Sequence, residues 1–333
     1  MKAIYQMTDK KQTGEGMNNR NDFDMVDIGE TDEAEVPVSP EKSSRWKRWI
    51  FQGCLVVGIL CLLVGAGIFI KVKVDEKKVR EQMEVLRNQV ELDEVRRQQE
   101  EADKLAEAAE ETVVVEPEKS VEAESEAEEP ERVENPYKSA FQENEDMAAW
   151  IQIEGTVIDY PVMQTMEDEN YYLKRGFDGK SNENGCLILD TDSRIIEPLS
   201  TNLIIHGHNM KSGEMFGTLT EYEDEAYFEE HRYISLYTKE CQRNYEIIAV
   251  FRSQVYRKTD DVFKFYQFFQ ADVQEEFDVF YDNIMEMSLY DTGVSAEFGD
   301  RFLTLSTCVY HVENGRFVVV AREMETGDYY EEY

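Results

Sequence analysis

The strongest hydrophobic pattern along the chain is an uncharged run from Ile50 to Ile70, IFQGCLVVGILCLLVGAGIFI. At 1.5 Å per residue, a helix of this length spans about 30 Å, which is the thickness of a bilayer core. A cleaved signal peptide has a shorter apolar region, and here some 49 residues precede the run. Trp46 and Trp49 lie where an interfacial aromatic belt is expected. The pattern therefore predicts a retained membrane anchor over residues 49–71.

The next segment, residues 72–112, is highly charged and is predicted to be a helix. Four apolar residues recur in it at spacings of 4, 3 and 4: Val79, Met83, Leu86 and Val90. This is a coiled-coil seam of about two heptads, and three to four are needed for a firm assignment. A coiled coil and a solvated stalk helix both stay open, and we favour the stalk. Residues 113–134 are acidic with two Pro, which predicts an extended linker.

From Asn135 onward the pattern changes to short alternating apolar runs between turn residues, which is typical of strands. The predicted strands are TVIDYPV (156–162), GCLILD (185–190), TNLIIHGH (201–208), ISLYT (234–238), YEIIAVF (245–251), RFLTLSTC (301–308) and RFVVVAR (316–322). Between the strands at 245–251 and 301–308, aromatic residues spaced by 3 and 4 predict one helix over 263–287. Mostly strands with one helical insertion predict a β-barrel or a curled mixed sheet.

Charge narrows the possible partners of the chain. The formal net charge is −36, and residues 135–333 carry 16 Lys or Arg against 39 Asp or Glu. A nucleic-acid partner is excluded on this balance, because phosphate binding needs clustered cations. Four cations precede the apolar run and five follow it, so the flanks do not decide orientation. The polar residues 1–44 predict a disordered tail.

These patterns divide the chain into four parts. They are a tail (1–48), a transmembrane anchor (49–71), a helical stalk with an acidic linker (72–134) and a folded domain (135–333).

Cys308 is the first candidate for chemistry, because it ends an apolar strand and precedes the polar loop VYHVENG. A rigid strand end is where a fold presents a nucleophile, although a buried structural Cys is the more common outcome for one residue taken alone. Cys54 and Cys61 are interpreted as apolar fillers of the anchor, Cys186 as core, and Cys241 as part of a polar turn. We expect no disulfide between the last two.

His206 and His208 are two residues apart at the end of a strand, so they share a face if the strand continues. An HxH pair can bind zinc, but no third ligand follows at a suitable spacing, so neither a metal nor a cofactor is expected. His231 is predicted to be solvated, and His311 lies in the loop after Cys308.

The two strands around Cys308 predict which arginine lies beside it. RFLTLSTC, a seven-residue loop and RFVVVAR form an antiparallel hairpin, so the start of the second strand lies opposite the end of the first. Arg316 is therefore close to Cys308. Arg322 is six residues further along, about 20 Å away at roughly 3.3 Å per residue.

At this point the motifs TLSTC (304–308), IIHGHNMKSGEMFGTL (204–219) and GRFVVVAR (315–322) resemble those of a class B sortase. WIQIEGTVIDYPVMQ (150–164), YYLKRGFDGKSNENGCLILD (171–190) and SLYDTGV (288–294) resemble that class too, as does the helical insertion. The resemblance covers residues from about 135 to 325. It implies a mainly β fold, a closed barrel of about eight strands with peripheral helices and a helical insertion before the last strand pair.

The resemblance also implies a membrane-anchored cysteine transpeptidase of the bacterial surface, with its N-terminus in the cytoplasm and its catalytic domain outside. Such an enzyme cleaves a C-terminal sorting motif, NPxTN-like or a related Pro-x-Thr signal, in a secreted protein. It then transfers the new carboxyl end to an amine of the cell-wall precursor, a lipid II-type peptide. By this resemblance Cys308 is the nucleophile, His208 the proton carrier and Arg316 the oxyanion ligand. Ser306, and also Tyr256, fall at substrate-contact positions.

Two residues depart from the family pattern. Family members often have Tyr two residues before the catalytic His, where this chain has His206, so His206 competes with His208 for the role of active imidazole. His206 also falls at a substrate-binding position. Some class B members have Asp two residues after the Cys, where this chain has Tyr310.

Other classes fit the order of the residues less well. Papain-like proteases place Cys before His, a chymotrypsin-like protease has a Gly-flanked Cys, and the Ser-His-Gly-Cys motif of another transpeptidase class is missing. The non-enzymatic alternative is an anchored adhesin or sensor with a β-barrel head, in which Cys308 is structural.

Overall fold

The computed structural model describes residues 41–111, 132–309 and 312–330. Helix α1 (Glu41–Glu111) comes first, and the other helices are α2 (Lys138–Glu143), α3 (Glu225–Glu230) and α4 (Gln274–Met287), with 3₁₀ turns η1 (Tyr171–Lys174), η2 (Leu219–Glu223) and η3 (Phe265–Gln267). The strands are β1 (Arg132–Val133), β2 (Met147–Gln152), β3 (Asp159–Met163), β4 (Leu187–Leu189), β5 (Asn202–Gly207), β6 (Tyr233–Tyr237), β7 (Cys241–Gln254), β8 (Phe302–Cys308) and β9 (Gly315–Tyr330).

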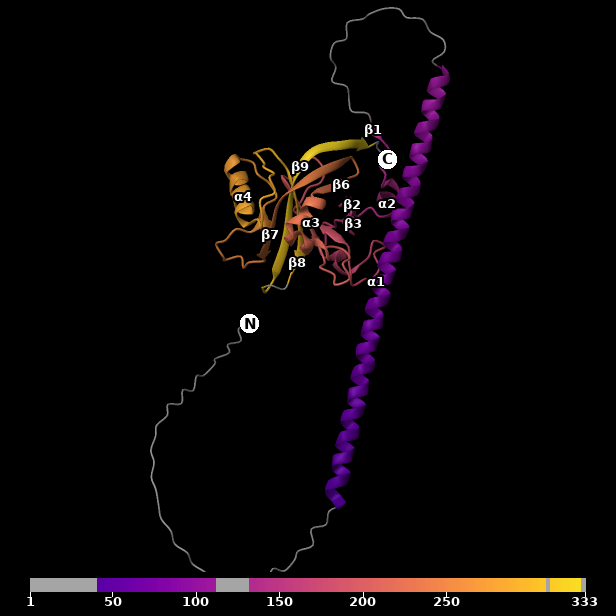
Figure 1. Ribbon diagram of the computed structural model, residues 1–333, viewed down its shortest axis with the longest axis vertical. Coiled ribbons are helices and arrows are strands. Elements are labelled where there is room, and N and C mark those ends of the chain that lie inside the picture. Colours follow the sequence, from indigo (N-terminus) through magenta and orange to yellow (C-terminus); the bar gives the residue numbers. More distant parts are fainter. Residues whose placement is uncertain (1–40, 112–131, 310–311, 331–333) are drawn as a thin grey trace, which may run out of the picture. The chain divides into compact units, whose positions relative to one another are not determined.

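Eight of these strands close into a barrel (Figure 1). The order is β9-β7-β6-β2-β3-β4-β5-β8, and β8 pairs back with β9. Strand β1 adds to the outside of β9 in parallel. The predicted closed barrel of about eight strands is therefore confirmed, and every predicted strand overlaps an observed one. Strand β2, the first of the barrel, is the one that the alternation of apolar residues did not indicate.

Two clusters of buried side chains hold the barrel together. One fills its interior and includes Trp150, Ile205, Leu305 and Phe317, all at most 1% exposed. The other lies outside the wall, where α4 covers β7, β8 and β9. Successive residues of a strand face opposite sides, so the odd positions of β8 supply the interior and the even positions supply the outer face.

The helical insertion is shorter than the predicted span of 263–287. The segment forms the turn η3 and then α4, which begins only at Gln274. Before α4, the carbonyls of Phe268 and Phe269 accept hydrogen bonds from Asn202 at the start of β5. These bonds hold the segment against the start of β5, and the structure describes no helix between η3 and α4. The aromatic periodicity still marks a buried face, because Phe268 stacks on Phe280 with ring centroids 4.0 Å apart.

Helix α1 has a segment that is long and apolar enough to cross a membrane, as the apolar run predicts. The helix already includes residues 41–48, which were assigned to the tail, while residues 1–40 of the predicted tail lie outside the described residues. Residues 113–131, most of the predicted acidic linker, lie outside them as well. Near the end of that linker, Arg132 and Val133 pair with β9 as β1 instead of remaining unpaired.

The predicted solvated stalk is corrected by the burial of its apolar seam. Val79, Met83, Leu86 and Val90 are 3%, 4%, 4% and 9% exposed and belong to the main core cluster of the domain. The Arg87 side chain donates to the Asp159 carbonyl at 2.6 Å and pairs with the Asp159 carboxylate at 2.8 Å. The 4-3-4 spacing thus marks a helix face that packs against its own domain, so the segment around 79–90 is part of the folded unit.

Candidate active site

The register of β8 and β9 places Cys308 directly opposite Arg316. Arg322 lies opposite Phe302, at the far end of the same strand pair. The hairpin geometry that selected Arg316 over Arg322 is therefore confirmed. Cys308 is exposed and Arg316 is half-buried, so both side chains are accessible at the end of the strands.

The parallel pairing of β5 with β8 brings the histidines to the same end. His206 lies level with Ser306, and Gly207 lies level with Thr307. His208 is the first residue after β5, as Cys308 is the residue after Thr307, whereas His206 lies two residues earlier, about 7 Å along the strand. Along the chain, His208 is therefore the histidine closer to the strand end that carries Cys308.

These side chains line one pocket of about 460 Å³ on the outer face of the barrel wall. Its lining comprises Glu169, Asn170, Leu173, Cys186, Ile188, Asp190, His206, Gly207, His208, Ser306, Thr307, Cys308 and Arg316. The same face of β8 is covered further along by α4, where Phe277 stacks on Phe302 at 5.5 Å. The insertion thus closes one end of this face, and the pocket occupies the other.

His208 is held by a backbone carbonyl. Its Nε2 lies 2.8 Å from the carbonyl oxygen of Leu173, in η1. A carbonyl only accepts hydrogen bonds, so this contact puts the hydrogen on Nε2 and leaves Nδ1 as the base of the neutral ring. The next residue, Asn209, donates from its side chain to the Cys308 carbonyl at 2.9 Å. This bond ties the segment that carries the histidine to the end of β8.

The remaining predicted site residues differ in their positions. The Arg316 guanidinium donates through Nη1 to the carbonyl of Gly315 at 3.1 Å, so the side chain is bonded to the backbone at the start of its own strand. Ser306 is 2% exposed and lines the pocket. Tyr256 is not among the pocket-lining residues. It follows β7, where its backbone N–H donates to the Tyr266 hydroxyl at 2.9 Å.

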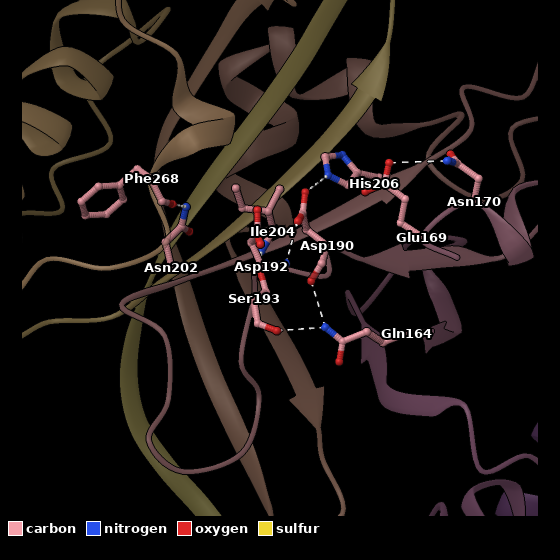
Figure 2. A network of polar contacts seen from close by, with 10 residues as sticks. All are labelled: Gln164, Glu169, Asn170, Asp190, Asp192, Ser193, Asn202, Ile204, His206 and Phe268. Atoms are coloured by element: carbon pink, nitrogen blue, oxygen red, sulfur yellow. Dashed lines mark hydrogen bonds and ion pairs between the residues drawn. The ribbon is translucent and has the colours of Figure 1, made fainter. Parts of the chain in front are cut away.

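Asp190 is a pocket residue that sequence reasoning missed. Its Oδ2 lies 3.0 Å from Nε2 of His206 (Figure 2). Burial by itself raises the pKa of this carboxyl, but the hydrogen bonds from His206 and from the Asp192 N–H outweigh burial, and the pKa is lowered. Asp190 is therefore ionised at neutral pH. A polar residue ending the strand GCLILD was the only signal in the sequence, and nothing there pointed to the histidine 16 positions later.

The domain's other thiols differ sharply from Cys308 in their surroundings. Cys186 and Cys241 are buried and unpaired, so the disulfide is absent as expected, while Cys241 lies at the start of β7 and not in a polar turn. Burial and then the negative charge of Asp178 raise the pKa of Cys186 to about 12. Cys186 therefore stays protonated at neutral pH. Among the described residues, no three His, Cys, Asp or Glu side chains gather as metal ligands.

A family model described as the sortase domain matches residues 151–324. Sortase B of Listeria monocytogenes is 33% identical over 180 residues, which are 53% of this chain and 69% of that protein. Sortase B of Staphylococcus aureus is 27% identical over 197 residues, 58% of this chain and 76% of that protein.

A solved structure agrees with the sequence relatives. The X-ray structure of Clostridium perfringens sortase B superposes with a TM-score of 0.51 at 28% identity, over 56% of this chain and 99% of that one. The chain belongs to the sortase family of cysteine transpeptidases, and its relatives identify it as a class B sortase.

Proposed function

We propose that this chain is a membrane-anchored sortase that cleaves a sorting motif near the C-terminus of a secreted protein, NPxTN-like or a related Pro-x-Thr signal. The new carboxyl end is transferred to an amine of the cell-wall precursor. The observation that carries the proposal is the strand register, which pairs Cys308 with Arg316 at the end of β8 and β9 and Gly207, the residue before His208, with Thr307, the residue before Cys308. The side chains of Cys308, Arg316 and His208 line the same pocket.

In the first step, the Cys308 thiolate attacks the carbonyl carbon of the scissile peptide bond. A carbon–sulfur bond forms, the negative charge moves to the carbonyl oxygen, and the Arg316 guanidinium stabilises that charge. The carbon–nitrogen bond then breaks as protonated His208 gives its proton to the leaving amine. The hydrogen bond to the Leu173 carbonyl occupies Nε2–H, so the transferred proton is the one on Nδ1.

In the second step, an amine of the cell-wall precursor attacks the thioester. His208 takes a proton from the incoming nitrogen at Nδ1, a carbon–nitrogen bond forms, and the carbon–sulfur bond breaks to restore the Cys308 thiolate. Atoms and charge balance over the two steps, and no cofactor is required. If water replaces the amine, the same sequence ends in hydrolysis.

The location of the enzyme follows from the same proposal. The apolar segment from Ile50 to Ile70 supports a single membrane span. Sorting substrates and the cell-wall precursor amine are met outside the cell, so we assign the N-terminus to the cytoplasm and the barrel domain to the extracellular side.

The proposal is tested with the full-length chain in detergent micelles, because residues of the stalk belong to the core of the domain. The protein is incubated with fluorescent peptides that carry different sorting motifs, in the presence of hydroxylamine as the amine. We expect cleavage and hydroxamate formation for at least one peptide, and complete loss of both in Cys308→Ala. Cys241→Ala, which removes a buried thiol outside the pocket, should retain turnover.

Absence of Cys308-dependent cleavage over the whole panel would contradict the enzyme proposal. In that case the anchored adhesin or sensor, with Cys308 as a structural residue, would be the better interpretation.

A further inference from the structure

A single carboxylate, that of Glu214, connects helix α1 to the two segments that hold His208. Glu214 lies in the histidine loop, which we define as residues 208–217. Its Oε1 accepts from Nε and Nη2 of Arg80 in α1, both at 3.3 Å, and its Oε2 accepts from the Asn184 side chain at 3.0 Å. The Glu214 side chain is only 12% exposed. The reaction proposed above does not use any of these contacts.

The backbone of the histidine loop is closed at its base. The His208 carbonyl accepts from the Phe216 N–H at 3.1 Å, and Asn209 pairs with Met215 as an isolated antiparallel bridge. Met215 has a φ of 54°, a left-handed conformation that a residue other than glycine keeps only when its surroundings fix it. Met215 and Phe216 are both at most 2% exposed. The backbone position of His208 is therefore tied to the turn that contains Glu214.

The second segment supplies the carbonyl that orients the imidazole. The Leu173 carbonyl, in η1, lies 2.8 Å from Nε2 of His208. A Cβ added at Gly185 would lie 2.4 Å from the Leu173 carbonyl oxygen, so the chain beside Asn184 packs directly on this carbonyl. Asn184 thus connects Glu214 to the backbone that holds the His208 ring.

Helix α1 makes a further contact with this second segment. The Gln82 side chain contacts the Asp178 carboxylate, and its Oε1 would lie 3.2 Å from a Cβ added at Gly176. Arg80 and Gln82 lie beside the buried apolar seam of α1, so the helix that carries them is fixed to the domain. The family model matches residues 151–324, so this support comes from a part of the chain outside it.

We propose that Glu214 is a positioning residue for His208, and that α1 holds Glu214 in place through Arg80. The two contacts keep Nδ1 of His208 directed at the leaving amine, so the docked helix contributes to proton transfer as well as to stability. A group that transfers a proton loses rate when its geometry is relaxed. The inference rests on the proposed function, because it concerns the proton transfer in that reaction.

The test compares two substrates on the full-length enzyme. A sorting-motif peptide needs a proton from His208 to release its amine, whereas a phenyl ester of the same acyl segment releases phenolate without one. Glu214→Ala should lower the single-turnover rate of peptide cleavage about tenfold or more. The single-turnover release of phenolate should change by less than about threefold. A general structural defect would lower both rates by the same factor.

Substitutions in α1 test the role of the helix. Arg80→Met should lower the rate of peptide cleavage about two- to fivefold, because the Arg80 side chain is 70% exposed and such pairs are weak. Arg80→Lys keeps the positive charge beside Glu214 and should retain most of the rate. Lys77→Met is the matched control, since it removes an exposed pair with Glu81 within the same helix. It should leave both rates unchanged.

Three results would overturn the inference: a wild-type rate of peptide cleavage in Glu214→Ala, an equal loss for peptide and ester, or an effect of Lys77→Met as large as that of Arg80→Met. Hydrogen–deuterium exchange of residues 208–217 in Cys308→Ala separates this failure from that of the proposed reaction. Faster exchange when Glu214→Ala is added, without turnover by the wild type, would support the tie between Glu214 and the loop and contradict the transpeptidase. Unchanged exchange would overturn the inference whatever the turnover.

Discussion

Two surfaces of the barrel domain show opposite uses of polar and apolar groups. The pocket around Cys308 holds exposed or half-buried polar side chains and a buried hydroxyl without a partner in the described chain. The docking seam, defined as Val79, Met83, Leu86 and Val90 of α1, buries apolar side chains against the core. Unpaired polar groups in the pocket contribute no stability to the folded domain but stay available to a ligand, whereas burial of the apolar seam stabilises the domain.

This comparison implies that substitutions in the pocket should change activity with little change in stability, and that substitutions at the seam should do the reverse. The largest effect is expected at Arg316. Arg316→Ala removes the group that we propose as the oxyanion ligand, so kcat/KM should fall about 100- to 1,000-fold. Peptide cleavage measures the rate, and thermal unfolding should show little change.

Arg322→Ala is the matched control for this prediction, because Arg322 is on the same strand and the same face, opposite Phe302. It should retain most of the turnover. A larger loss of activity in Arg322→Ala than in Arg316→Ala would show that the oxyanion ligand has been assigned to the wrong end of the hairpin.

The second effect is expected at the seam. Leu86 is 4% exposed, and truncation of a buried Leu usually costs 2–5 kcal/mol, so Leu86→Ala should lower the free energy of unfolding by about 2–4 kcal/mol. Denaturant unfolding of the barrel domain in the full-length chain provides the measurement. The kcat of the folded fraction should stay close to the wild-type value.

The neighbouring Val85 provides the control, since it is 64% exposed on the same helix. Val85→Ala should change the free energy of unfolding by less than about 0.5 kcal/mol. Equal destabilisation by the two substitutions would mean that helix propensity, and not burial of the seam, accounts for the loss.

The smallest effect is expected for the polar contact beside the seam. Arg87→Met removes the bonds to the carbonyl and carboxylate of Asp159 and should destabilise the domain by about 1–2 kcal/mol. Arg96→Met removes an exposed i,i+3 pair with Asp93 and should have almost no effect. If the two variants had the same free energy of unfolding, the contacts of Arg87 with Asp159 would contribute no more stability than an exposed ion pair.

Much of the fold was predictable because its signals are local. Alternation within each run identified seven of the strands, and the hairpin spacing selected Arg316 from two arginines on one face. The helical insertion was overestimated at its start, where the carbonyls of Phe268 and Phe269 bond to Asn202, more than 60 residues away, and the chain is not helical. Periodicity indicates which residues are buried, but it does not indicate which distant groups compete for backbone hydrogen bonds.

The amino-acid sequence by itself determined the apolar segment, the strands and the alignment of Cys308 with Arg316, because each depends on spacing along the chain. Only the tertiary structure decided what the 4-3-4 seam packs against, since a stripe of apolar residues suits a partner helix or the chain's own domain equally well. The tertiary structure likewise brought Asp190 to His206 through the pairing of β4 with β5. The sequence contains both residues, but their meeting depends on sheet order, which local patterns do not specify.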